Sequence, residues 1–175
     1  MAMTQSWRAL LAVAALVFFS GVPGLALAGA KQDALLLGYV GSWKGSGMLT
    51  GGDEPEKFSC RNSITDGGQG KINYQGRCAV AGLNLAIYGT IKYNDDTRRY
   101  EGTMHSNTEF EGDAIGRQRG SSIVFDFKQQ KQRDGHELTI GSKLTLQRDG
   151  YTVEFDVWIA DSEMKMSTSV PFERK

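Results

Sequence analysis

The chain has few of the residue types that build catalytic and metal sites. It contains two cysteines and two histidines in 175 residues, and neither His105 nor His136 has a ligand-like spacing to a cysteine. His105 is followed by Ser106, but neighbouring residues of a strand point to opposite faces, so the two make no nucleophile–base dyad. The carboxylates are scattered, with no paired motif. The sequence therefore predicts no metal site, no cofactor and a non-catalytic role, with an enzyme that uses an internal polar cluster left open as an alternative.

The formal net charge is zero. Near-neutrality argues against nucleic acid as a partner, because binding to phosphates requires a concentrated positive patch. The one basic cluster, Arg117-Gln118-Arg119, is flanked by glycines and is interpreted as a solvated turn. A protein partner is left open.

Only one long apolar run is present, and it lies at the N-terminus. It spans Leu10–Phe19, follows Arg8, and is succeeded by the small-residue pattern Ala26-x-Ala28. This order is typical of a secretory signal peptide. We therefore predict a signal peptide over residues 1–28, with cleavage before Gly29, or alternatively before Lys31. The protein is then periplasmic or secreted, with no membrane-spanning segment after cleavage.

An uncleaved membrane anchor is the alternative, although the apolar run is shorter than the roughly 20 residues that a spanning helix needs. Because Arg8 is the only charged residue before Gly29, the mature chain carries one more acidic than basic residue.

The two cysteines lie symmetrically about the glycine-rich turn 66–70. If the chain folds back there, residues whose numbers sum to about 138 face each other, so Cys60 meets Cys78 and Ile64 meets Tyr74 on one face. Facing strand cysteines can reach disulfide distance, and an exported protein meets an oxidising compartment. The sequence thus predicts a hairpin with a Cys60–Cys78 disulfide; two buried free thiols are the alternative.

The rest of the chain shows short alternating runs broken by Gly, Asn and Asp, which is typical of an all-β sandwich or barrel. We interpret residues 29–38 as an N-terminal stub with at most one helical turn, and residues 39–175 as one β-barrel domain. Residues 129–135 are expected to form a charged loop, and Asp149-Gly150 a two-residue hairpin turn in which Leu146 faces Val153. About ten strands are expected, over residues 39–49, 56–65, 71–81, 83–93, 98–106, 108–117, 121–128, 136–148, 151–160 and 164–173.

Ten antiparallel strands joined to their sequence neighbours form a meander, and a meander of this length closes to remove its exposed edges. The first strand reads Gly41-x-Trp43-x-Gly45-x-Gly47. This pattern resembles the opening of calycin barrels: lipocalins, fatty-acid-binding proteins and nitrobindin-like proteins. The resemblance implies a barrel whose tryptophan plugs one end and whose interior holds a small apolar ligand. It would also imply haem bound through a histidine on a late strand, but residues 151–173 contain none, so we expect no haem.

The fold class we predict is therefore an all-β, calycin-like antiparallel barrel with one disulfide. Its function is expected to be non-catalytic binding of a small apolar or amphipathic ligand in the interior. An envelope interaction module or inhibitor using the outer surface, near Trp158, is the alternative. The predicted ligand-binding residues are the inward-facing ones, namely Trp43, Tyr74, Ile91, Tyr93, Tyr100, Met104, Phe125, Phe127 and Phe155.

Overall fold

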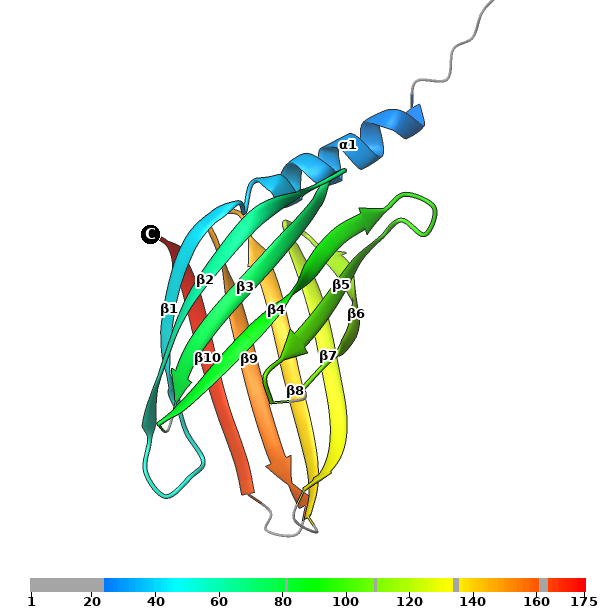
Figure 1. Ribbon diagram of the computed structural model, residues 1–175. Helices are drawn as coiled ribbons and strands as arrows, with labels where there is room; N and C mark the ends of the chain where they lie inside the picture. Colours follow the sequence, from blue (N-terminus) through cyan, green and yellow to red (C-terminus); the bar gives the residue numbers. More distant parts are fainter. Residues whose placement is uncertain (1–23, 81, 109, 134–135, 161–163) are drawn as a thin grey trace, which may run out of the picture.

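The computed structural model describes residues 24–175 apart from 81, 109, 134–135 and 161–163. One helix precedes ten antiparallel strands that close into a barrel (Figure 1). The elements are α1 (Gly24–Leu37), β1 (Gly41–Leu49), β2 (Glu56–Gly68), β3 (Lys71–Val80), β4 (Leu83–Asn94), β5 (Arg99–Ser106), β6 (Gly112–Arg119), β7 (Ser122–Arg133), β8 (His136–Gln147), β9 (Gly150–Ile159) and β10 (Met164–Arg174). The predicted fold class is confirmed.

The barrel closes where the first strand pairs with the last. Trp43 of β1 faces Arg174 of β10, and Gly45 faces Phe172. All other neighbours in the sheet are also neighbours in sequence. Closure gives every strand of the described barrel two neighbours and so removes the two edge strands of the meander.

The stapled hairpin has the predicted register. Cys60 faces Cys78 and Ile64 faces Tyr74, and the two cysteines form a disulfide with their Cα atoms 4.1 Å apart. The turn contains Gln69 with a φ of 54° between two glycines that also have positive φ. The disulfide and its pairing are confirmed.

The hairpin between β8 and β9 is shifted from the predicted register. Leu146 faces Tyr151, not Val153, and Gln147 pairs with Gly150, which places the two-residue turn at Arg148-Asp149. Each residue of β8 therefore faces a β9 residue two positions earlier than predicted. Because strand side chains alternate with period two, a shift by two positions leaves every side chain on its predicted face. The Asp149-Gly150 turn was wrong, and the inward face was right.

Three further elements differ from the expectation. The stub forms a helix over several turns, α1, whose first residues precede the predicted cleavage site. In the charged segment 129–135, residues 129–133 belong to β7 and pair with β8, and residues 134–135 lie outside the described residues. Finally, β6 begins at Gly112 because the Ser106 hydroxyl accepts hydrogen bonds from the N–H groups of Thr108 and Phe110, which turns the chain out of the ladder.

Aromatic side chains cover glycines inside the barrel wall. Tyr74 lies against Gly89, its partner across the ladder, where a Cβ would come 2.6 Å from the tyrosine oxygen. Phe125 lies in the same way over Gly116. In each pair the ring of one strand fills interior space, and the glycine of the neighbouring strand leaves room for that ring to lie against the backbone. Strand glycines thus set the places where rings enter the interior.

Candidate functional site

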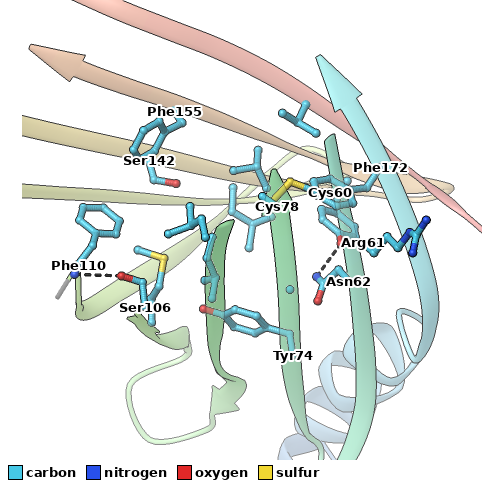
Figure 2. A pocket seen from close by; sticks show the side chains of 18 of the residues that line it. Cys60, Arg61, Asn62, Tyr74, Cys78, Ser106, Phe110, Ser142, Phe155 and Phe172 are labelled. Carbon is cyan, nitrogen blue, oxygen red and sulfur yellow. Dashed lines mark hydrogen bonds between the residues drawn. A yellow bond between two sulfur atoms is a disulfide. The ribbon is translucent and has the colours of Figure 1, made fainter. Parts of the chain in front are cut away.

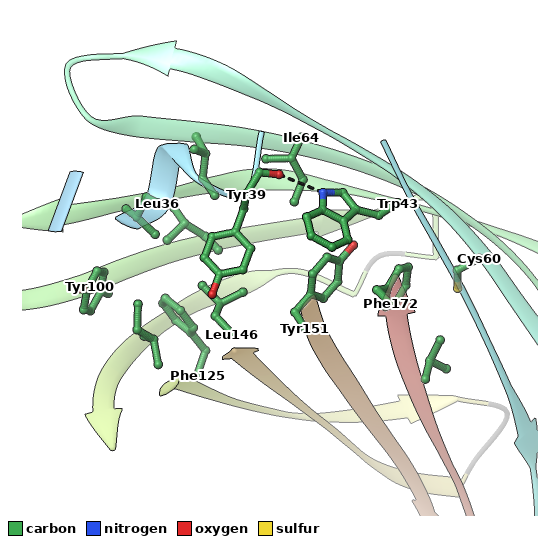
Figure 3. Packing of buried hydrophobic residues seen from close by; sticks show 14 of the residues in the cluster. Leu36, Tyr39, Trp43, Cys60, Ile64, Tyr100, Phe125, Leu146, Tyr151 and Phe172 are labelled. Atoms are coloured by element: carbon green, nitrogen blue, oxygen red, sulfur yellow. Dashed lines mark hydrogen bonds between the residues drawn. The ribbon is translucent and has the colours of Figure 1, made fainter. Parts of the chain in front are cut away.

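Trp43 plugs one end of the barrel. Its side chain is 2% exposed, and its indole N–H donates to the Tyr39 carbonyl oxygen at 2.9 Å. The ring meets Tyr151 edge-on at 5.2 Å between centroids, and the Arg174 guanidinium carbon lies over the Trp43 ring, 4.5 Å from its centroid. Figure 3 shows the Trp43 ring beside the rings of Tyr39 and Tyr151. A buried tryptophan with a satisfied N–H closes the barrel here.

The helix covers the same end (Figure 1). Leu36 is fully buried against the barrel, and Gln32 accepts a hydrogen bond from the Tyr100 hydroxyl. Both contacts lie after the two predicted cleavage sites, so either mature chain would keep them. The helix and Trp43 together separate this end of the interior from solvent.

A cavity of about 170 Å³ occupies the interior beyond this plug. Its wall is almost entirely apolar, with the disulfide, Phe58, Val153 and Phe172 among its members. Figure 2 shows Cys60 and Cys78 on one side of it, and Phe110 and Phe155 on the other. A second cavity of about 50 Å³ adjoins it near Phe127. The two share Tyr74, Ile91, Met104, Ser142 and Leu144, which makes them neighbouring parts of one interior space.

The predicted ligand-binding residues fall into three groups. Tyr74, Ile91, Met104 and Phe155 line the main cavity. Phe125 and Phe127 line the smaller one. The remaining three, Trp43, Tyr93 and Tyr100, belong to or pack against the buried cluster at the closed end and line neither cavity. Contact of any of them with a ligand remains a prediction.

Sequence reasoning missed the residues of the β5–β6 connection. Phe110 is 6% exposed and packs edge-on against Phe127 at 4.6 Å between centroids and against Phe155 at 6.1 Å. The Asn107 side chain ties the connection to β4, accepting from the Ala86 N–H and donating to the Asn84 carbonyl oxygen. Phe110 therefore covers the cavity on the side away from Trp43. Its role was not predicted because the sequence pattern places Phe110 in a strand over residues 108–117.

The cavity wall carries no ionised group that faces inward among the described residues. Arg61 is the one charged residue on the wall, and Figure 2 shows its guanidinium pointing away from the cavity. Both phenols on the wall form a hydrogen bond: the Tyr74 hydroxyl donates to the Thr103 carbonyl oxygen, and the Tyr151 hydroxyl accepts from the Asn62 side-chain amide. The buried Thr168 hydroxyl, also on the wall, has no hydrogen-bond partner. The Asn62 side-chain oxygen, on the same wall, also lacks a partner. The interior is thus uncharged, with two buried polar atoms that have no hydrogen-bond partner.

Burial perturbs the tyrosines of this interior. Desolvation raises the pKa of Tyr74 and of Tyr151 well above the ordinary value, and the hydrogen bond from Asn62 only partly offsets it for Tyr151. At the closed end, desolvation raises the pKa of Tyr100 to about 12, with smaller contributions from Tyr93, Tyr39 and Asp33. The folded barrel therefore favours neutral phenols.

The free energy of unfolding is expected to fall in alkaline solution. The pKa values of Tyr74 and Tyr151 are higher in the folded than in the unfolded protein. The free energy of unfolding that these two phenols contribute is therefore fully present below the unfolded pKa of about 10, and it is lost as pH rises toward their folded pKa values. The slope should approach about 1.4 kcal/mol per pH unit for each phenol. Urea unfolding at a series of pH values measures it. Tyr74→Phe should remove the part of this pH dependence that Tyr74 contributes. An unchanged slope in that variant would show that the Tyr74 phenol is not the group responsible.

Two further features of the described residues bear on function. No three His, Cys, Asp or Glu side chains among them converge in a way that could hold a metal ion. No helix among them is long and apolar enough to span a membrane.

Solved structures similar to this chain share its barrel. Rv2717c from M. tuberculosis superposes with a TM-score of 0.60 over 82% of this chain and 97% of that chain, at 11% identity. The S-type phycobiliprotein lyase CPES from Guillardia theta superposes with a TM-score of 0.51 over 84% of this chain and 97% of its own, at 9% identity. No protein-family model and no curated protein sequence matches the chain. At such low identities the likeness establishes the fold.

Proposed function

We propose that the protein is exported and that its barrel binds a small, neutral, apolar or amphipathic molecule without transforming it. The observation that carries the proposal is the apolar cavity of about 170 Å³ inside the barrel. An apolar cavity of about 150 Å³ is enough to hold benzene, whereas drug-sized ligands occupy roughly 300 Å³ or more. The expected ligand is therefore little larger than a single ring.

The uncharged wall narrows the chemistry of this ligand. An ionised carboxylate or amine would enter a low-dielectric space with no counter-charge, which is strongly unfavourable. Affinity would come from buried apolar area, at about 25 cal/mol per Å². The Thr168 and Ser142 hydroxyls on the wall can orient a polar end of the ligand.

The resemblance of Gly41-x-Trp43-x-Gly45-x-Gly47 to lipocalins, fatty-acid-binding proteins and nitrobindin-like proteins supports a binding role, as does the structural likeness to a phycobiliprotein lyase. The disulfide and the apolar N-terminal run support export, because disulfides persist in oxidising compartments.

A second candidate function is protein interaction through the outer wall. Trp158 is 55% exposed on β9, and tryptophan is enriched in protein–protein interfaces relative to the rest of the surface. A Trp158 variant that loses a protein partner but keeps ligand binding would favour this candidate.

Filling the cavity tests the first candidate. Ser142 lies on the cavity wall between its facing partners Phe127 and Phe155. Ser142→Leu should abolish binding of toluene, measured by calorimetric titration, while the protein stays folded. The matched control is Ser169→Leu, which places the same side chain on an exposed position of β10 and should leave binding unchanged. Failure of the wild type to bind toluene, hexanol or indole would refute the proposal.

A further inference from the structure

Three cationic side chains form one row across the outer wall of the barrel. Lys44 of β1 faces Arg61 of β2, and Arg61 faces Arg77 of β3. Facing residues of antiparallel strands have Cβ atoms about 5 Å apart, and like charges at that distance are destabilising. All three side chains are exposed. Their arrangement has no role in the interior site.

The row lacks the pairing found elsewhere on the outer wall. Lys92 pairs with its facing residue Glu101 at 3.1 Å, and Lys143 pairs with its facing residue Glu154. Within the described part of the chain, no salt bridge involves any of the three row residues. Glu173 faces Lys44 at one end of the row, and Ala86 faces Arg77 at the other. The two arginines therefore face only each other, a lysine and an alanine.

The disulfide holds the two arginines side by side. Cys60 and Cys78 are the preceding and following neighbours of Arg61 and Arg77, and they face each other in the adjacent register position. Their bond lies on the inner face, while the arginines project from the outer face, as Figure 2 shows for Arg61. A slip of register that would separate the arginines is blocked by the covalent bond.

The row lies in a broad hollow of about 890 Å³ on the outer wall. On either side of the row the hollow is lined by hydrogen-bonding side chains, namely Ser42, Ser63 and Gln75 on one side and Ser46 and Ser59 on the other. Guanidinium groups bind phosphate oxygens in a bidentate fashion, and hydroxyls and amides add hydrogen bonds. An oxyanion seated between the arginines would offset their mutual repulsion.

From this arrangement we propose that Lys44, Arg61 and Arg77 form a binding site for phosphate groups on the outer wall. The site is independent of the interior cavity and would leave it free to hold its own ligand. The phosphate can belong to a soluble molecule or to a lipid headgroup. The chemistry of recognition is the same in both cases, and the experiment below distinguishes the two sources.

The test removes the two arginine charges with glutamine, as Arg61→Gln with Arg77→Gln. At low ionic strength, millimolar pyrophosphate should raise the melting temperature of the wild type by about 3 °C, and chloride at equal ionic strength should not. In the double variant the affinity should fall at least tenfold. The matched control, Arg117→Gln with Arg119→Gln, removes two exposed arginines of β6 and should bind as the wild type does.

A second arm uses vesicles of phosphatidylcholine with and without phosphatidylglycerol, assayed by co-sedimentation. Binding only to the phosphatidylglycerol vesicles, lost in the arginine variant and kept in the control, assigns the site to a lipid phosphate. The same pattern with pyrophosphate alone assigns it to a soluble phosphate. The proposal is overturned if the wild type binds neither probe, or if the arginine variant binds as well as the control. These outcomes do not depend on the interior cavity, so a wild type that fails to bind toluene could still bind phosphate on its outer wall.

Discussion

Replacing Trp43 with alanine is expected to lower the free energy of unfolding by about 4 kcal/mol, within the range for buried aromatic residues. The change removes a side chain that is 2% exposed, together with its contacts to Tyr39 and Tyr151. It also leaves the Tyr39 carbonyl oxygen without the indole donor. Urea unfolding followed by circular dichroism measures the loss.

Trp158→Ala is the matched control. That tryptophan is 55% exposed on the outer face, so its removal should change the free energy of unfolding by no more than about 0.5 kcal/mol. Equal losses in the two variants would show that Trp43 does not plug the barrel.

Removal of the disulfide is expected to cost about 3 kcal/mol, since the bond joins residues separated by 18 positions. Cys60→Ser should therefore unfold at lower urea concentration than the oxidised wild type. The reduced wild type serves as the control without a substitution, and its midpoint should lie close to that of Cys60→Ser. If reduction leaves the wild-type midpoint unchanged, the bond contributes nothing to the barrel and this part of the account is wrong.

Much of the barrel could be predicted because strand geometry is local. Alternation with period two assigns each residue to a face, and the symmetry of Cys60 and Cys78 about their turn gives the hairpin register. The shifted β8–β9 hairpin shows why faces are easier to predict than partners: Leu146 stays inward although it meets Tyr151. A turn moved by one residue changes every partner and no face.

The parts that escaped prediction depend on contacts between distant segments. Helix α1 has little amphipathic pattern of its own, and it docks through Leu36 and Gln32 onto the barrel end. Phe110 leaves its strand because the Ser106 and Asn107 side chains satisfy backbone groups of the connection and of β4. The size of the cavity follows from how rings such as Phe125 lie over glycines of other strands. A local sequence pattern does not predict any of these contacts, because each joins segments that are distant in the sequence.

The central claim is that the interior holds a small neutral molecule, and native mass spectrometry tests it most directly. The mature protein, purified gently from its own cellular compartment, should carry an added mass that disappears on denaturation and is absent from Ser142→Leu. A wild-type spectrum that shows only the mass of the polypeptide, identical in ligand content to that of Ser142→Leu, would contradict the claim.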